Sequence, residues 1–114
     1  MSREAGKPHR HPLRSWPDLP EGAELELASA MFRALGDASR LRLLARLASG
    51  EACVTELADL EGEKITTVSA RLQTLRDVRL VKRRRDARHV YYALWDAHVL
   101  RLVRSAMKHA AEKQ

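Results

Sequence analysis

Two short helical segments joined by a glycine-containing turn place the strongest constraint on how this chain can fold. Helices are predicted at about residues 55–60 and 65–76, with Glu61-Gly62 as the turn between them. Thr55 is the candidate cap of the first of these two helices. Two helices connected in this way predict a helix-turn-helix, whose second helix is expected to enter the major groove of DNA.

A basic hairpin follows the second helix directly. Residues 80–85 and 88–94 are predicted to form two strands, with Asp86-Ala87 as the turn. Alternation along a strand places basic side chains on both faces, which suits a wing that lies against a phosphate backbone or in a minor groove. The basic residues are Lys82 and Arg84 on one face, Arg83 and Arg85 on the other, and Arg88 after the turn.

Three further helices complete a fold that is mainly α with this small β-hairpin, a winged helix-turn-helix. They are predicted at residues 22–35, at about 38–48, and in a last helix that reaches about Glu112. Asp37 and Asp96 stand where N-caps are expected. Apolar residues at helical spacing in the first and last helices favour dimerisation through these two elements.

The composition fits one domain that binds a polyanion. Residues 1–21 hold all four prolines and predict a flexible arm, before a domain at residues 22–114. The formal charge of +6 favours nucleic acid, although an acidic protein or an anionic lipid surface would also fit. One cysteine, Cys53, excludes an internal disulfide, and the lack of a secretion signal or a long apolar run predicts a cytoplasmic protein without a membrane partner.

The second helix of the helix-turn-helix should separate a buried face from a DNA-reading face. Val68, Leu72 and Leu75 fall at helical spacing and should pack inward. Hydroxyl, amide and guanidinium groups on the other side suit base edges and phosphates. The outward set is Lys64, Thr66, Thr67, Ser69, Ala70, Arg71 and Gln73. For the basic hairpin alone, a solvated charged surface is the competing interpretation.

The last helix carries a pattern of metal-binding residue types at its two ends. Asp96 and His98 stand near its start, and His109 and Glu112 near its end. The two histidines lie within roughly 20° of the same face but about 16.5 Å apart along the axis, so one ion cannot reach both in one chain. His109 and Glu112 are i, i+3 neighbours that can share an ion. An N-cap position lets the Asp96 carboxylate swing toward His98.

Two antiparallel copies of the last helix about a two-fold axis would complete two metal sites per dimer. Each would join the first pair of ligands from one chain to the second pair from the other. Two imidazoles and two carboxylates suit tetrahedral Zn(II); Co(II) also fits, and Ni(II) fits less well. The competing interpretation is a helix cap and three ordinary surface side chains.

From Phe32 to Glu112 the sequence resembles the ArsR/SmtB family of metal-sensing repressors. The resemblance is carried by residues 35–44, 52–58, 68–72 and 88–92, and by the Asp96-x-His98 and His109-x-x-Glu112 pattern. It implies a homodimer that represses genes for metal efflux or sequestration and is released from DNA by the ion. The sequence departs from the family at Arg71, where many members have His, and at Lys64-Ile65, where small or polar residues are commoner.

The resemblance also allows a second metal site near the first helix of the helix-turn-helix. Cys53 and Glu56 are i, i+3 neighbours there, and His9 and His11 lie in the arm. Thr55 stands where the arsenic sensors have a second cysteine, which argues against arsenic or antimony. A small buried residue at a helix start is the competing interpretation of Cys53.

Three functions are compatible with these sequence features. The first is a repressor of double-stranded operator DNA that responds to Zn(II) or Co(II); the second is the same fold responding to thiol oxidation at Cys53. The third is a non-regulatory module whose last helix only dimerises. An enzyme with a small organic substrate is not expected, because the sequence has no paired nucleophile and base and no phosphate loop, and four protein ligands would fill the zinc site.

Overall fold

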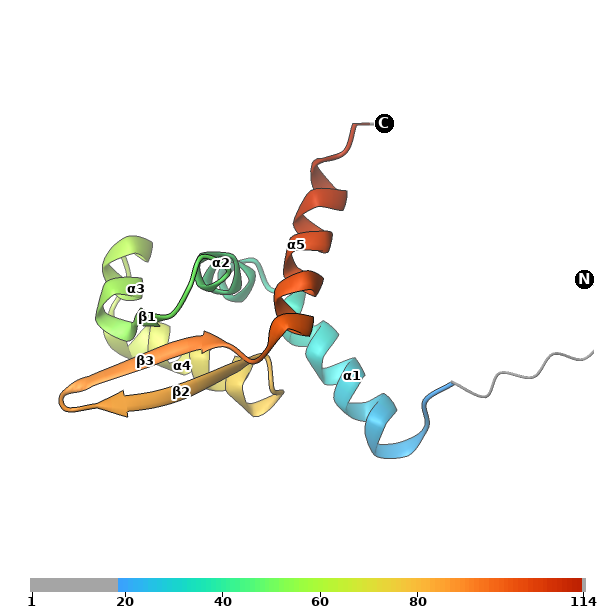
Figure 1. The fold of residues 1–114 in the computed structure, drawn as a ribbon, viewed down its shortest axis with the longest axis horizontal. Helices are drawn as coiled ribbons and strands as arrows, with labels where there is room; N and C mark the ends of the chain where they lie inside the picture. The colour runs from blue at the N-terminus through green and yellow to red at the C-terminus, as the bar shows by residue number, and fades with distance from the viewer. Residues whose placement is uncertain (1–18, 114) are drawn as a thin grey trace, which may run out of the picture.

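The computed structural model describes residues 19–113, which form five helices and one three-stranded antiparallel sheet (Figure 1). The winged helix-turn-helix fold class is confirmed, with the β2–β3 hairpin extending away from the helices as the wing. Most of the predicted arm, including His9 and His11, lies outside the described residues. The elements are α1 (Gly22–Leu35), α2 (Ala38–Leu47), β1 (Ala52–Cys53), α3 (Val54–Glu61), α4 (Ile65–Asp77), β2 (Val81–Asp86), β3 (His89–Leu94) and α5 (Ala97–Ala111).

Two aspartates cap helices as predicted. Asp37 accepts a hydrogen bond from the backbone N–H of Arg40 at 3.0 Å, at the start of α2. Asp96 accepts one from the backbone N–H of Val99 at 3.1 Å, at the start of α5. Each bond satisfies an N–H group that has no partner within its own helix.

The cap predicted for α3 is wrong, and the reason is a short strand that the sequence did not indicate. Cys53, not Thr55, is the N-cap residue of α3, and no side chain caps this helix. Ala52 and Cys53 form β1, which pairs with the middle of β3, so the backbone is extended until it turns directly into the helix. The predicted hairpin is therefore part of a three-stranded sheet with the order β1-β3-β2.

The turn of the helix-turn-helix depends on Gly62. This residue ends α3 in the left-handed conformation, with φ of +65°. Glycine adopts that conformation without the steric cost that a Cβ atom imposes. The turn brings α4 back against α2 and α3, the packing of a helix-turn-helix.

Aliphatic side chains from all five helices and from β2 fill the core. The inward face predicted for α4 is confirmed, since Val68, Leu72 and Leu75 are fully buried. By contrast, Leu25 and Phe32 of α1 are 52% and 64% exposed, so α1 turns these side chains away from the core. The largest fully buried side chains are Leu43, Leu44, Leu57, Leu72, Leu75, Leu80, Val68, Val81 and Val103.

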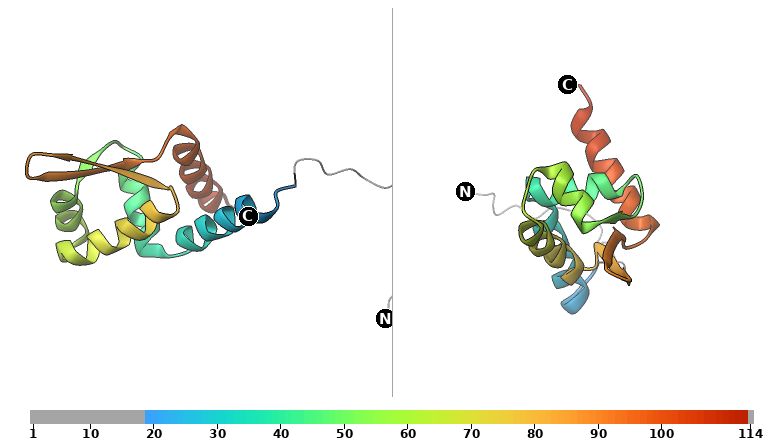
Figure 2. Two further views of the ribbon diagram at one scale, coloured as in Figure 1. Left: turned by 90° about the horizontal axis from the view of Figure 1, so that it is seen from below. Right: turned by 90° about the vertical axis from the view of Figure 1, so that its left-hand side faces the viewer.

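The wing has two distinct faces, as strand alternation predicted. Arg83 pairs in register with Tyr92, which is buried, so this side of the hairpin faces the helices. Arg84 pairs with Tyr91 and lies on the opposite side. The views in Figure 2 show α3 and α4 together on one side of the hairpin.

Candidate DNA-binding and metal sites

The outward surface of α4 and the inner face of the wing border a common groove. Thr66, Ser69 and Gln73 line it from α4, and Arg83 lines it from β2. Ile65 also lines this groove and is about half exposed at the first position of α4. Hydroxyls, an amide and a guanidinium thus face one space, which is a donor and acceptor set suited to base edges and phosphates. Ile65 adds an apolar surface that the sequence prediction did not include in the set.

Two of the predicted DNA-contacting side chains have partners within the protein. Arg71 forms an ion pair with Glu63, with 3.5 Å between its Nη2 and Oε2 of the glutamate. The amide of Gln73 donates to Asp77 at 2.7 Å. Such surface bonds contribute little to stability, so both side chains can exchange them for a nucleic-acid partner. Of the other predicted members of this set, Lys64 and Thr66 are exposed, and Thr67 and Ser69 are partly buried.

The basic residues of the wing are all exposed, but Arg84 differs from the others in its contacts. Its Nε and Nη2 atoms donate to the two carboxylate oxygens of Glu51, each at 2.7 Å. Its guanidinium carbon lies 4.5 Å from the centre of the Tyr91 ring. The bond to Arg84 lowers the pKa of Glu51, and the same bond raises the pKa of Arg84. No sequence pattern indicated Glu51 or Tyr91 as a partner of Arg84.

The four predicted metal ligands form two pairs at opposite ends of α5. Asp96 Oδ2 lies 3.4 Å from His98 Nδ1, and His109 Nδ1 lies 3.5 Å from Glu112 Oε1. The histidine side chains are 83% and 86% exposed. Within residues 19–113, no group of three or more His, Cys, Asp or Glu side chains is close enough to hold a metal ion. Each pair therefore offers two ligands to a site that needs more.

Asp96 uses its two oxygens differently. Oδ1 accepts the bond from the Val99 N–H that caps α5, whereas Oδ2 faces His98. The bond from Val99, followed by that from His98, lowers the pKa of Asp96. The carboxylate is therefore ionised at neutral pH, which is the form that binds metal.

Cys53 lies beside a histidine of the wing. Its Sγ is 3.1 Å from Thr55 Oγ1 and 3.7 Å from His89 Nδ1. The hydrogen bond with Thr55 is the largest cause that lowers the pKa of the thiol, to about 7. Glu56, the other predicted ligand in this region, is exposed in the first turn of α3. The structure thus gives Cys53 a partner, His89 of β3, that the sequence analysis did not identify.

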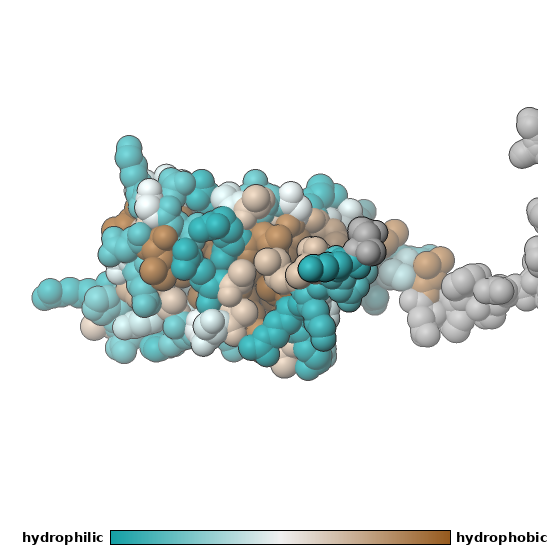
Figure 3. Space-filling model, turned by 90° about the horizontal axis from the view of Figure 1, so that it is seen from above, coloured by the Kyte–Doolittle hydropathy of each residue, from teal (hydrophilic) through white to brown (hydrophobic). Residues whose placement is uncertain are grey.

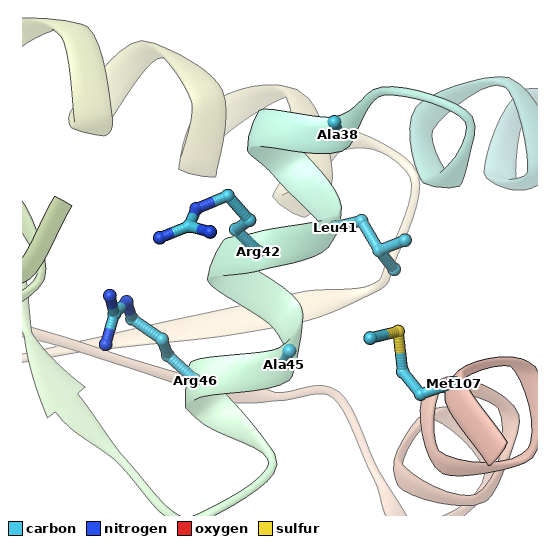
Figure 4. A pocket seen from close by; sticks show the side chains of 6 residues that line it. All are labelled: Ala38, Leu41, Arg42, Ala45, Arg46 and Met107. Carbon is cyan, nitrogen blue, oxygen red and sulfur yellow. The ribbon is translucent and has the colours of Figure 1, made fainter. Parts of the chain in front are cut away.

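An apolar groove lies between α2 and the C-terminal half of α5 (Figure 4). Leu41 and Ala45 of α2 face Met107 of α5 across it, and Arg42 and Arg46 border it. Hydrophobic surface beside α5 is also visible in Figure 3.

The same two arginines connect α2 to the end of α3. Arg42 Nε donates to Glu61 Oε1 at 2.8 Å, and Arg46 donates to the other oxygen of this carboxylate and to the Leu60 carbonyl. The Glu61 side chain is only 5% exposed, and the bond with Arg42 is the main cause that lowers its pKa.

Comparison with known proteins decides what kind of protein carries these features. No protein-family model matches the chain. The transcriptional repressor SmtB homolog of Synechocystis sp. is 46% identical over 96 residues, which cover 82% of this chain and 73% of the relative. The chain belongs to the ArsR/SmtB family of transcriptional regulators.

Further ArsR/SmtB similarities agree in sequence and in structure. The HTH-type transcriptional regulator KmtR of Mycobacterium tuberculosis is 40% identical over 96 residues, covering 84% of this chain and 74% of that protein. The homodimeric winged helix-turn-helix DNA-binding domain of Mb0332 from Mycobacterium bovis, a possible ArsR-family regulator, superposes with a TM-score of 0.76 at 33% identity, covering 86% and 90% of the two chains.

The family assignment makes this chain a DNA-binding regulator and not an enzyme, as predicted. None of the helices within residues 19–113 combines the length and the apolar character that a bilayer crossing requires.

Proposed function

We propose that this ArsR/SmtB regulator binds operator DNA as a metal-free homodimer and releases it when Zn(II) binds between the subunits. The observation that carries the proposal is the pairing of Asp96 with His98 and of His109 with Glu112 at the two ends of one exposed helix. One chain cannot bring the two half-sites together, so metal binding depends on how two chains are arranged in the dimer. Co(II) is the second candidate ion for this set of donors.

The exposed apolar surface supports the homodimer. Leu25 and Phe32 of α1, and Leu102 and Met107 of α5, are large apolar side chains that the folded monomer leaves at least one-third exposed. The Mycobacterium bovis neighbour is itself described as a homodimeric domain. Pairing α5 antiparallel with its copy would join the two kinds of half-site.

Similarity to a metal-related regulator supports an ion as the effector. The cadmium resistance transcriptional regulatory protein CadC homolog of Staphylococcus aureus is 33% identical over 100 residues, which cover 87% of this chain and 82% of that protein. For the present chain, the donors on α5 favour Zn(II), because two imidazoles and two carboxylates suit its tetrahedral geometry. The possible second site at Cys53 and Glu56 stays a prediction.

The groove between α4 and the wing supports operator DNA as the partner. Thr66, Ser69 and Gln73 would read base edges, with the basic wing on the phosphate backbone beside them. In a two-fold dimer, the two copies of α4 would enter successive major grooves, so the operator should be an imperfect palindrome with half-sites roughly 34 Å apart.

The test is a zinc titration of metal-free protein bound to a fluorescent DNA fragment from upstream of its own gene, followed by anisotropy. Wild type should leave the DNA near two zinc ions per dimer. His109→Ala should bind DNA equally well and stay bound, because each site loses an imidazole. Lys108→Ala, which removes a neighbouring side chain that is not a metal donor, is the control and should behave as wild type.

Other outcomes separate the competing functions. Tight DNA binding that ignores zinc in both wild type and His109→Ala would contradict the metal switch. Release by a thiol oxidant in wild type but not in Cys53→Ser would then favour the redox repressor, which the contact between Cys53 and His89 makes the second candidate. Lack of specific DNA binding in every form would leave only the dimerisation module.

A further inference from the structure

We infer that Arg84 is a positioning residue that fixes the wing, and that the phosphate contact from the middle of β2 comes from Arg83 instead. The inference rests on the proposed binding of operator DNA and assigns different roles to two adjacent arginines that the sequence treats alike. The different contacts of the two guanidinium groups support this inference.

Arg84 spans the whole sheet. The residue belongs to β2, its guanidinium lies over Tyr91 of the central strand β3, and it ends on Glu51, which directly precedes β1. Tyr91 in turn pairs in register with Cys53 of β1. The Glu51–Arg84–Tyr91 contacts thus tie the outer strand of the wing to the segment that leads into α3, the first helix of the helix-turn-helix.

The charge of Arg84 is already satisfied. Two parallel N–H···O bonds of 2.7 Å to one carboxylate are the bidentate geometry that guanidinium groups also use for phosphate. A DNA contact would have to replace both bonds and the contact with the Tyr91 ring. Each of these interactions is weak at an exposed site, but together they hold the side chain in one place.

Arg83 has the opposite surroundings. It lies on the face of the wing that points toward α4, and it lines the groove together with Thr66, Ser69 and Gln73. DNA bound by α4 would therefore contact the face of the wing that carries Arg83, whereas Arg84 lies on the opposite face of the sheet. The position of Arg83 relative to α4 in turn depends on the contacts that Arg84 makes on the far face.

The salt dependence of DNA binding distinguishes a phosphate contact from a positioning residue. The slope of log K against log salt falls by about 0.9 for each phosphate contact that is removed. Arg83→Ala should lower the slope by about this amount. Arg84→Ala should weaken binding at each salt concentration, about two- to fivefold as expected for an exposed ion pair, with an unchanged slope.

Removing the Glu51 carboxylate should change the DNA affinity in opposite directions for the two possible roles of Arg84. If Arg84 positions the wing, Glu51→Gln should weaken DNA binding about as much as Arg84→Ala, and the two together should have the effect of one. If Arg84 binds phosphate, Glu51→Gln should strengthen binding, because it frees the guanidinium. Asp59→Asn neutralises an exposed carboxylate of α3 and serves as the control. Its effect on DNA affinity measures what the loss of one negative charge does in general. The exchange Glu51→Arg with Arg84→Glu should restore part of the affinity.

These outcomes decide the inference. Equal losses of slope for Arg83→Ala and Arg84→Ala, or stronger binding by Glu51→Gln than by Asp59→Asn, would overturn it. Partial rescue by the charge exchange, with the slope lost only in Arg83→Ala, would establish it. If wild type shows no specific DNA binding, the proposed function fails first and takes this inference with it.

Discussion

At the scale of the residue, Cys53 shows how neighbours from another element change the chemistry of a side chain. The thiol is half-buried where β1 meets α3, and it is in contact with Thr55 and with His89 of β3. A hydroxyl that donates to sulfur stabilises the thiolate, and the thiolate is the form that reacts and binds metal. Cys53 is therefore a more reactive group than its position at a helix start indicates.

This environment predicts a pH profile for alkylation. Because the pKa of Cys53 is lowered to about 7, the rate of reaction with iodoacetamide should rise with pH and reach half its maximum at about pH 7. Thr55→Val removes the largest cause of the shift, so its midpoint should move to higher pH, toward that of an ordinary thiol. Stopped-flow or mass-spectrometric rates between pH 5 and 10 measure both, roughly covering the range of thiol ionisation. Thr74→Val serves as the control, because it removes a hydroxyl that bonds to the Ala70 carbonyl of α4 and not to the thiol. Identical midpoints in all three proteins would refute this account.

At the scale of the element, the start of α5 combines a structural and a proposed metal-binding role in one carboxylate. Asp96 both caps the helix and faces His98. Asparagine is as good an N-cap as aspartate, whereas alanine is a poor one. Substitutions at this position therefore separate the two roles.

Asp96→Asn should keep the melting temperature of the metal-free protein and weaken zinc binding, because the amide caps the helix but is a poorer ligand than a carboxylate. Asp96→Ala should weaken zinc binding too and also lower the melting temperature by about 5 °C, the scale expected for a lost cap. Thermal unfolding followed by circular dichroism, with and without zinc, gives both quantities. An unchanged zinc affinity in Asp96→Asn would remove Asp96 from the metal site.

The elements that the sequence predicted well are those with a local signal. The helices carry apolar residues at helical spacing. The pairs 96/98 and 109/112 are close together because each is local to one end of α5, and their role as metal ligands stays a prediction. β1 was missed because two residues show no alternation. The partners of Arg84 and Cys53 were missed because Glu51 and His89 are 33 and 36 positions away, and only the order β1-β3-β2 brings them together.

At the scale of the whole molecule, the most telling feature is a helix that stands away from the body. From residue 104 to residue 113, α5 and its end are exposed, and Figure 1 shows them projecting beyond the other elements. Large apolar side chains of α1 and α5 are exposed nearby. A second copy of the chain is the partner that the proposed function provides for these surfaces.

The homodimer predicts that charge on α1 or α5 separates the subunits. Phe32→Glu and Met107→Glu should each raise the dimer dissociation constant about tenfold or more, the scale expected when a large apolar anchor is lost. Leu60→Glu changes a similarly exposed apolar residue of α3 and should leave the dimer intact. Sedimentation velocity over a concentration series measures the equilibrium. If Leu60→Glu dissociates the dimer and the other two do not, the interface lies elsewhere.

The carboxylate of Glu61, held between Arg42 and Arg46, has a mechanical consequence. Because Arg42 and Arg46 of α2 both bind Glu61, the last residue of α3, we expect these two helices to move together and not to hinge at the turn. Leu41 and Ala45 of the same helix α2 line the groove that Met107 enters from α5. We therefore expect a displacement of α2 from the α5 side to carry α3 with it.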